Sequence, residues 1–303
     1  MDIHSISIIT VNYNGLKDTC ELIDSIPLSD EVEIIVVDNA SKTDEATILQ
    51  TRYPHIIAIR SEINLGFAGG NNLGIKAAHG HFLFFINNDT VLKGTEEEKL
   101  QAIHTLKARL LSSQKTGIVC PKIRFAWDDC PIQFAGYTPL TGITMRNHSI
   151  GFGEYDRGQY DTPHPTPYAH GAAMMVKRAA IEEAGLMPAC YFLYYEELDW
   201  SLMIRHAGYD IWYDPCCTIF HKESQSTGQQ SPLRTYYITR NRLLFALRNI
   251  PRPRRYATYL YLILLVALRD ILKNLLHRQP ALAKATTLGI VHFFKGRYGH
   301  QHI

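Results

Sequence analysis

Residues Ile6-Ser-Ile-Ile-Thr-Val11 and Glu33-Ile-Ile-Val-Val37 are two short runs of mostly β-branched apolar side chains. Runs of this kind, without alternating polar residues, are typical of strands that are buried on both faces of a parallel sheet. Between them, residues 16–26 carry apolar side chains at helical spacing. The order strand, helix, strand predicts a βαβ unit with a right-handed crossover.

The same alternation continues along the next part of the chain. Residues 56–59 and 82–86 repeat the strand pattern, and residues 71–78 between them have helical spacing. We therefore predict an α/β fold with a doubly wound, mostly parallel central sheet and flanking helices. Residues 120–170 are rich in proline and glycine, which favours loops and short strands.

The composition is that of a folded protein with a basic C-terminal tail. Of the 303 residues, 46% are hydrophobic, and 31 Lys and Arg stand against 29 Asp and Glu. These values exclude a disordered or collagen-like chain. From Arg252 onward there are nine basic residues and one acid, which leaves 22 basic and 28 acidic residues before it. The tail therefore predicts an anionic partner, and its apolar content favours a membrane surface over nucleic acid.

Residues 256–268 of this tail are 13 uncharged residues flanked by arginines. A spanning helix needs about 20 apolar residues, so we expect an amphipathic helix that lies in the membrane interface. The alternative is a helix that packs on the body of the protein or on a second copy in a homodimer. The six cysteines have neither metal-site nor CxxC spacing, and the N-terminus shows no signal-peptide pattern. Both observations predict a cytoplasmic protein, and the basic tail predicts that it is peripheral on the inner face of the cell membrane.

Polar side chains follow the first four predicted strands, at residues 12–15, 38–41, 61–72 and 87–89. Ligands of open α/β sheets bind outside the carboxyl ends of the strands. Any one of these segments is explained equally well as a turn or a helix cap. Their coincidence at one edge of the sheet predicts a ligand site.

Four features near this edge suggest a nucleotide and a metal ion. Asp38 can accept hydrogen bonds from a nucleobase or ribose, or else cap the helix after residues 41–44. Glycines in segment 64–74 allow close approach of the backbone to a ligand, and the following helix offers N–H groups to phosphate. Asp89 is a candidate ligand for Mg²⁺ or Mn²⁺ between two phosphates. His221 is a candidate second ligand, although a single histidine is more often structural.

Three acids lie together in the segment Tyr194-Tyr-Glu-Glu-Leu-Asp-Trp200, before a helix predicted over residues 198–207. Acids at a helix start can simply complement its dipole. The functional interpretation is a general base among Glu196, Glu197 and Asp199, whose pKa is raised by neighbouring negative charge.

Eight ordered motifs in residues 5–245 resemble the family 2 glycosyltransferases, especially their rhamnosyltransferase-like branch. The motifs are Thr10-Val-Asn-Tyr-Asn-Gly, Val37-Asp-Asn-Ala-Ser, Asn64-Leu-Gly-Phe-Ala-Gly-Gly-Asn-Asn-Leu-Gly, Asn87-Asn-Asp, His170-Gly-Ala-Ala-Met-Met-Val, Tyr195-Glu-Glu-Leu-Asp-Trp, Phe220-His and Tyr237-Ile-Thr-Arg-Asn.

This resemblance implies a GT-A fold, a dTDP- or UDP-linked sugar donor, Mg²⁺ or Mn²⁺, and inversion at the anomeric carbon. Asp89 and His221 match the metal-site positions. The positions implied for the nucleotide sugar are Val11, Asn12, Asn14, Asp38, Asn39, Asn64, Gly66, Gly69, Gly70, Asn71, Asn72, Asn87, Asn88, Gly171, Ala172 and Arg240. The implied acceptor is a saccharide or lipid-linked saccharide in cell-surface polysaccharide synthesis.

The catalytic base implied by the resemblance falls on Glu197, where the family commonly has Asp, and Asp199 is the alternative. The predicted domains are a catalytic domain over residues 1–245 and a basic helical tail over residues 246–303. Within the first, residues 1–120 form the nucleotide-sugar half and residues 121–245 the acceptor half. Two rival hypotheses are a nucleotidyltransferase and an inactive nucleotide-sugar-binding or scaffolding subunit.

Overall fold

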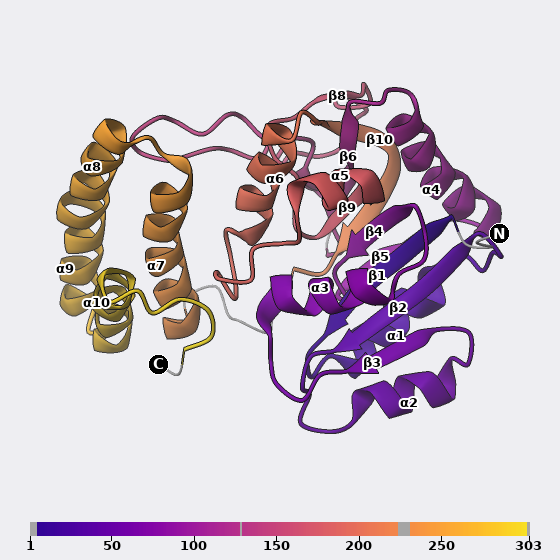
Figure 1. Ribbon diagram of the computed structural model, residues 1–303, viewed down its shortest axis with the longest axis horizontal. Coiled ribbons are helices and arrows are strands. Elements are labelled where there is room, and N and C mark those ends of the chain that lie inside the picture. The colour runs from indigo at the N-terminus through magenta and orange to yellow at the C-terminus, as the bar shows by residue number, and fades with distance from the viewer. Residues whose placement is uncertain (1–4, 128, 224–230, 302–303) are drawn as a thin grey trace.

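The computed structural model of the chain describes residues 5–127, 129–223 and 231–301. A central sheet with helices packed against it forms one part, and a group of helices near the C-terminus lies beside it (Figure 1). None of the described helices is long and apolar enough to cross a membrane.

The sheet is parallel at one end and mixed at the other. Its order is β3-β2-β1-β4-β9-β6-β10-β5, with β7 beside β6 and β8 beside β10. The first four strands pair in parallel, whereas β9 lies antiparallel between β4 and β6. The strands are β1 Ile6–Asn12, β2 Val32–Asp38, β3 Ile57–Arg60, β4 Phe82–Ile86, β5 Thr90–Leu92, β6 Thr116–Phe125, β7 Ile132–Phe134, β8 His164–Pro165, β9 Ala173–Lys177 and β10 Asp210–His221.

The predicted α/β fold is therefore confirmed, with the parallel pairing concentrated in the first half of the chain. The four early strands were predicted to within one or two residues of their ends. Strand β9 runs the other way because a long irregular segment, rather than a crossover helix, leads into it.

Helices α1 to α6 flank the sheet, and the rest form the C-terminal group (Figure 1). Helix α4 has a capping box formed by Thr95 and Glu98 and packs against β6 and β10. The helices are α1 Leu16–Ser25, α2 Glu45–Arg52, α3 Gly66–Ala77, α4 Glu96–Leu111, α5 Arg178–Ala184, α6 Glu196–His206, α7 Pro232–Asn249, α8 Arg252–Leu260, the π-helix η1 Tyr261–Ala267, α9 Leu268–Leu276 and α10 Pro280–Phe294.

The glycine-rich segment 64–74 is mostly helical, so the helix predicted over residues 71–78 starts earlier than expected. Helix α3 begins at Gly66 instead of residue 71. A Cβ atom on Gly70 would lie 2.8 Å from Val11 Cγ1, and one on Gly74 would lie 2.4 Å from Ile9 Cγ2. These two glycines thus let α3 pack closely on β1, and this packing outweighs the low helix propensity of glycine.

The C-terminal helices wrap around α7. Helix α10 packs along α7, and α8, η1 and α9 follow one another without a break. The predicted domain boundary at residue 246 falls inside α7. A cluster that includes Leu243, Phe245 and Phe293 joins these helices through buried apolar contacts.

Candidate active site

A cavity of about 460 Å³ opens at the carboxyl ends of β1, β2 and β4, beside the start of α3. Its volume suits a small ligand. The predicted site residues that line it are Val11, Asn14, Asn39, Asn64, Gly66, Asn71, Asn87, Asn88 and Asp89. Lining residues that were not predicted are Tyr13, Phe67, Ile86, Phe192, Leu193 and Leu233.

Two asparagines join the end of β2 to the start of α3. Asn39 Nδ2 donates to Asn64 Oδ1 at 3.1 Å and to the carbonyl oxygen of Gly66 at 3.1 Å. Asn39 Oδ1 accepts from the Leu65 N–H, and Asn64 Oδ1 accepts from the Gly66 N–H. These amide contacts hold the wall of the cavity in one arrangement.

Two of the N–H groups expected to face phosphate have protein partners instead. The Gly66 N–H donates to Asn64, and the Phe67 N–H donates to the carbonyl oxygen of Phe192 at 2.9 Å. Gly66 has φ +73°, and a Cβ there would lie 2.1 Å from that same carbonyl oxygen. Only glycine fits this contact between α3 and the segment before α6.

Asp89 and His221 meet because β5 pairs with β10. The antiparallel register places His221 opposite Thr90, next to Asp89. His221 Nε2 lies 3.1 Å from Asp89 Oδ1, and both side chains are buried. On the other side of the ring, His221 Nδ1 lies 2.8 Å from Gln133 Oε1. When Nδ1 carries the proton that this contact needs, the Nε2 lone pair points to Asp89.

This pair fits a divalent cation. Asp89 Oδ2 and His221 Nε2 are both buried without a hydrogen-bond partner among the described residues. A carboxylate and an imidazole lone pair at this distance repel unless a cation or a proton lies between them. No group of three His, Cys, Asp or Glu suited to a metal occurs in the described ranges. A metal here would therefore depend on ligand oxygens and water for its other positions.

Glu197 lies close to the same edge of the sheet. A Cβ on Gly171 would lie 3.7 Å from Glu197 Cγ, and the next residue, Ala172, accepts a hydrogen bond from the Asn87 N–H at 2.9 Å. The structure thus links Glu197, through Gly171 and Ala172, to the end of β4. Burial raises the pKa of Glu197 above its usual value, which suits a general base.

The two neighbouring acids have different surroundings. Asp199 is fully buried, forms an ion pair with Arg248 and accepts from Asn249 Nδ2 at 2.9 Å. Its carboxylate therefore joins α6 to α7. Glu196 is also buried, and its Oε2 has no hydrogen-bond partner among the described residues. Burial, and then the negative charge of Glu197, raise the pKa of Glu196 well above its usual value.

We expect Glu196→Gln to stabilise the protein more at pH 7 than at pH 4.5. The difference in melting temperature between the variant and the wild type should therefore be larger at pH 7. The folded chain keeps the Glu196 proton above the pKa of about 4.3 at which the unfolded chain loses it. Stability is therefore highest below that pH and falls as pH rises, by up to about 1.4 kcal/mol per pH unit until the raised pKa is reached. Calorimetry against pH measures this. The exposed Glu62→Gln is the control, and a pH-independent difference for Glu196→Gln would contradict the assignment.

The backbone before α6 is strained. Phe192, Tyr194 and Tyr195 have φ of 69°, 68° and 79°, in the left-handed region that these residues rarely adopt. Asn241 Nδ2 lies 2.7–3.0 Å from the carbonyl oxygens of residues 191, 193 and 194. Arg240 is fully buried and donates to the carbonyl oxygens of residues 191 and 299. Arg240 was predicted to bind the nucleotide sugar, and its side chain instead supports this segment.

We expect Asn241→Ala to destabilise the protein by about 1–3 kcal/mol, because it leaves buried carbonyl groups without their donor. Phe192 and Leu193 line the cavity, so nucleotide affinity should fall as well. Thermal unfolding and titration with a nucleoside diphosphate measure the two effects. Asn274→Ala, on α9, is the control. Unchanged stability and affinity would show that Asn241 does not hold the segment.

Several predicted residues lie outside the cavity lining. Asn12 Nδ2 donates to Glu45, Asn72 Nδ2 donates to the carbonyl oxygen of Met187, and Gly69 faces Leu65 of its own turn. Gly70 packs on β1 as described above.

Asp38 is fully buried and accepts from Arg60 Nη1 at 2.6 Å and from the Ser41 N–H at 3.1 Å. Asp38 is not among the residues that line the cavity. The N-cap residue of α2 is Asp44. Asp38 Oδ2 also accepts from the Ala46 N–H in the first turn of α2 at 3.3 Å, so the alternative that Asp38 helps to cap this helix agrees with the structure.

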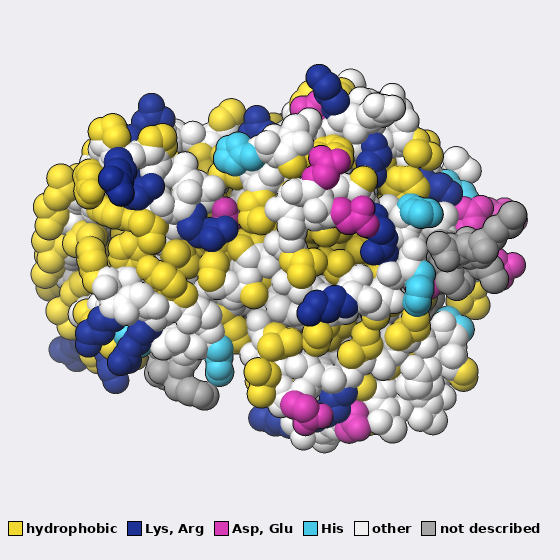
Figure 2. Space-filling model, in the orientation of Figure 1, with side chains coloured by type: hydrophobic (Ala, Val, Ile, Leu, Met, Phe, Trp, Pro, Cys, Tyr) yellow, Lys and Arg dark blue, Asp and Glu magenta, His cyan; other side chains and the backbone are white. Residues whose placement is uncertain are grey.

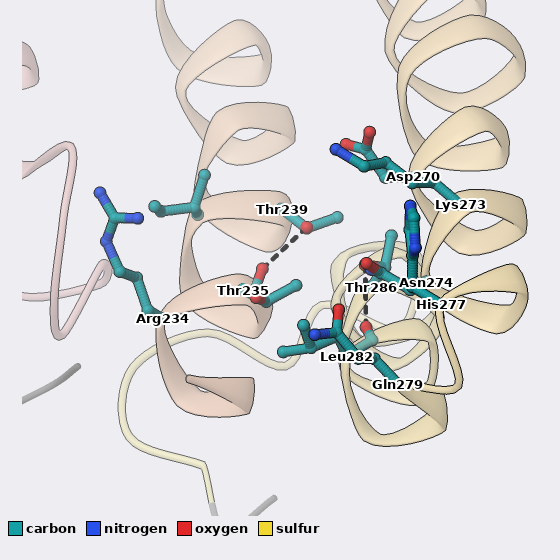
Figure 3. A pocket seen from close by; sticks show the side chains of 11 residues that line it. Arg234, Thr235, Thr239, Asp270, Lys273, Asn274, His277, Gln279, Leu282 and Thr286 are labelled. Carbon is teal, nitrogen blue, oxygen red and sulfur yellow. Dashed lines mark hydrogen bonds between the residues drawn. The ribbon is translucent and has the colours of Figure 1, made fainter. Parts of the chain in front are cut away.

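A second cavity, of about 620 Å³, lies between α7, α9 and α10. Figure 3 shows Thr235 and Thr239 on one wall and Lys273, Asn274 and His277 on the other. None of the predicted site residues lines it. The strand-edge cavity is therefore the candidate active site.

The sequence model of the family Glycosyl transferase family 2 matches residues 7–185, which is more than half of the chain. The chain belongs to glycosyl transferase family 2. Among curated proteins, this glycosyltransferase is 26% identical over 301 residues to the low-salt glycan biosynthesis hexosyltransferase Agl10 of Haloferax volcanii. The match covers 97% of this chain and 92% of Agl10.

Solved structures support the same fold for this glycosyltransferase. GalNAc-T7, solved with UDP, GalNAc and Mn²⁺, has a TM-score of 0.61 at 14% identity, over 88% of this chain and 57% of GalNAc-T7. The mannosyltransferase PcManGT of Pyrobaculum calidifontis, solved with GDP-Man and Mn²⁺, has a TM-score of 0.55 at 16% identity, over 95% of this chain and 75% of PcManGT. The predicted GT-A fold is thus confirmed.

Proposed function

We propose that this glycosyltransferase moves a hexose or rhamnose, with inversion, from a dTDP- or UDP-linked donor to a hydroxyl of a saccharide or lipid-linked saccharide. The observation that carries the proposal is that one edge of the sheet holds the cavity, the Asp89–His221 pair and Glu197. These are the three parts that transfer from a nucleotide sugar needs: a donor pocket, a counter-charge for diphosphate and a base.

The donor would lie in the strand-edge cavity. Tyr13, Phe67 and Phe192 give it aromatic walls, and Asn14, Asn39 and Asn88 give it polar groups. Aromatic faces suit a nucleobase or a sugar ring, and the amides fix its orientation by hydrogen bonds. Asn87 and Asp89, which line the cavity at the end of β4, would face the diphosphate.

Asp89 and His221 would hold Mg²⁺ or Mn²⁺, with Gln133 orienting the histidine ring. A bound divalent ion offsets the charge that builds up on a departing nucleoside diphosphate. The orphaned atoms Asp89 Oδ2 and His221 Nε2 support this role. With only these two protein ligands, phosphate oxygens of the donor would have to complete the site, and metal binding would then depend on donor binding.

Glu197 would act as the general base. It takes the proton of the acceptor hydroxyl while the acceptor oxygen forms a bond to the anomeric carbon and the bond from that carbon to the phosphate oxygen breaks. This single displacement inverts the configuration. Gly171 leaves space beside Glu197 because it has no side chain. Asp199 is the weaker candidate because its carboxylate is neutralised by Arg248.

A thermal-shift panel tests this proposal. The protein is melted with UDP, dTDP, GDP, CDP or ADP, each with Mn²⁺, Mg²⁺ or EDTA. A ligand that binds only the folded state raises the melting temperature. We expect a metal-dependent shift with UDP or dTDP. No shift with any nucleotide would contradict the proposal and favour the alternative of a scaffolding subunit.

A further inference from the structure

The helices α8, η1 and α9 form one continuous rod from Arg252 to Leu276 with an apolar outer face. Seven leucines on this rod are between 49% and 84% exposed. They are Leu260, Leu264, Leu265, Leu268, Leu272, Leu275 and Leu276, and we call them the leucine face. Single exposed leucines are normal on protein surfaces, whereas a contiguous apolar patch marks a binding surface.

The π-helix keeps the leucines on one side of the rod. In an α-helix of 3.6 residues per turn, each four-residue step turns about 40° past a full turn, so a series of such steps winds around the helix. Leu260, Leu264, Leu268 and Leu272 are spaced by four residues. The π-helical turns of η1, residues 261–267, hold more residues per turn and offset this drift. The leucine face therefore stays aligned along the rod.

Basic side chains border the leucine face. Arg252 and Arg254 lie exposed at the start of the rod, and Arg278 lies exposed just beyond its end. The single acid from Arg252 onward, Asp270, is paired with Arg269. Figure 2 shows hydrophobic side chains over the edge of the molecule formed by α8 and α9, with Lys and Arg above and below them.

We propose that the leucine face docks on an anionic phospholipid bilayer, with the rod lying in the plane of the interface. An apolar face bordered by cations matches acyl chains below a layer of anionic headgroups. The rod does not qualify as a spanning helix, and Arg269 interrupts its apolar sequence. Two copies packed through the same face would bring their cationic borders together, and the resulting repulsion disfavours a dimer.

This docking has one consequence that rests on the proposed function. The rod belongs to the group of helices that packs on α7. Leu233, in the first turn of α7, lines the strand-edge cavity, so α7 connects this cavity to the rod. A bilayer on the rod would therefore hold the active site near the surface where a lipid-linked saccharide is anchored.

Flotation of the full-length protein with lipid vesicles tests the docking without any donor or acceptor. We expect the protein to float with vesicles of phosphatidylcholine and phosphatidylglycerol, and only weakly with phosphatidylcholine alone. The double variant Leu268→Gln/Leu272→Gln should bind at least about ten-fold more weakly, because each buried leucine contributes about that factor. The control is Leu28→Gln/Leu111→Gln, two leucines of similar exposure on the sheet domain.

A charge variant tests the second half of the proposal. Arg252→Gln/Arg254→Gln should weaken binding to the anionic vesicles by about five-fold for each cation removed. Wild-type protein that fails to float, or leucine variants that float as well as the control, would overturn the docking. Sedimentation of the same proteins checks oligomeric state. The docking would also be overturned if the wild type is a dimer, the leucine variant is a monomer, and both bind vesicles equally well. The leucine face would then be assigned to contact with a second copy.

Discussion

Glu197→Gln is expected to lower kcat by about 10² to 10⁴-fold while nucleotide affinity stays near that of the wild type. The amide keeps the size of the side chain and cannot accept the proton of the acceptor hydroxyl, and general bases contribute about this factor. In the wild type, kcat/KM should rise with pH and level off above the pKa of Glu197, which burial raises. The variant should lose that rise.

The control for this substitution is Glu182→Gln, an exposed glutamate on α5. It makes the same chemical change on a nearby helix and should leave both kcat and the pH profile unchanged. Steady-state kinetics with the donor identified by the thermal-shift panel provide the measurement. Full activity of Glu197→Gln would remove Glu197 from the mechanism and would turn attention to Asp199.

Asp89→Asn is expected to weaken metal-dependent nucleotide binding by at least about 100-fold. Loss of a partner outside the first ligand shell already costs 10 to 100-fold, and Asp89 would be a direct ligand. The amide is neutral, so it cannot offset the charge of a cation beside His221. Titration calorimetry of UDP and dTDP with and without Mn²⁺ separates the metal-dependent part of the affinity from the rest.

The matched control is Asp210→Asn, an exposed aspartate at the end of β10 opposite to His221. It should bind metal and nucleotide as the wild type does. Without metal, Asp89→Asn and the wild type should bind the nucleotide equally weakly. That result would show that the substitution acts through the metal and leaves the cavity intact. Equal metal dependence in the two proteins would refute Asp89 as a ligand.

The parts of the site that depend on local sequence patterns were predictable. Short apolar runs identify β1, β2 and β4, and the polar residues that follow them line one cavity because parallel strands end at one edge. Tyr13 was missed although it lies between two predicted residues, Asn12 and Asn14. Its signal was an aromatic residue within a polar strand-end segment.

The contacts between distant segments were not predictable in the same way. Gln133 lies 88 residues from His221 and orients its ring, yet nothing in the sequence around Gln133 indicates this. Nothing in the sequence around Asp199 indicates that its carboxylate has a partner. The ion pair with Arg248 forms because α6 packs on α7. Helix α3 shows the opposite effect, since its glycines indicate a loop locally and serve helix packing on β1.

Helix α4 was overlooked for another reason. Thr95 and Glu98 form a capping box, a start signal that the sequence itself contains. Its apolar face is narrow, and three acids in its first turn hide the periodicity. This helix supports β6 and β10 and thereby the strand that ends at His221.

The central claim is that the edge of the sheet near β4 binds a nucleoside diphosphate through a metal at Asp89 and His221. Crystals grown with Mn²⁺ and UDP or dTDP, measured at the manganese absorption edge, test it most directly. We expect one anomalous peak in contact with Asp89 and His221, with the diphosphate beside it and the base in the cavity lined by Val11 and Asn39. A peak elsewhere, or nucleotide bound in the cavity between α7 and α9, would contradict the account.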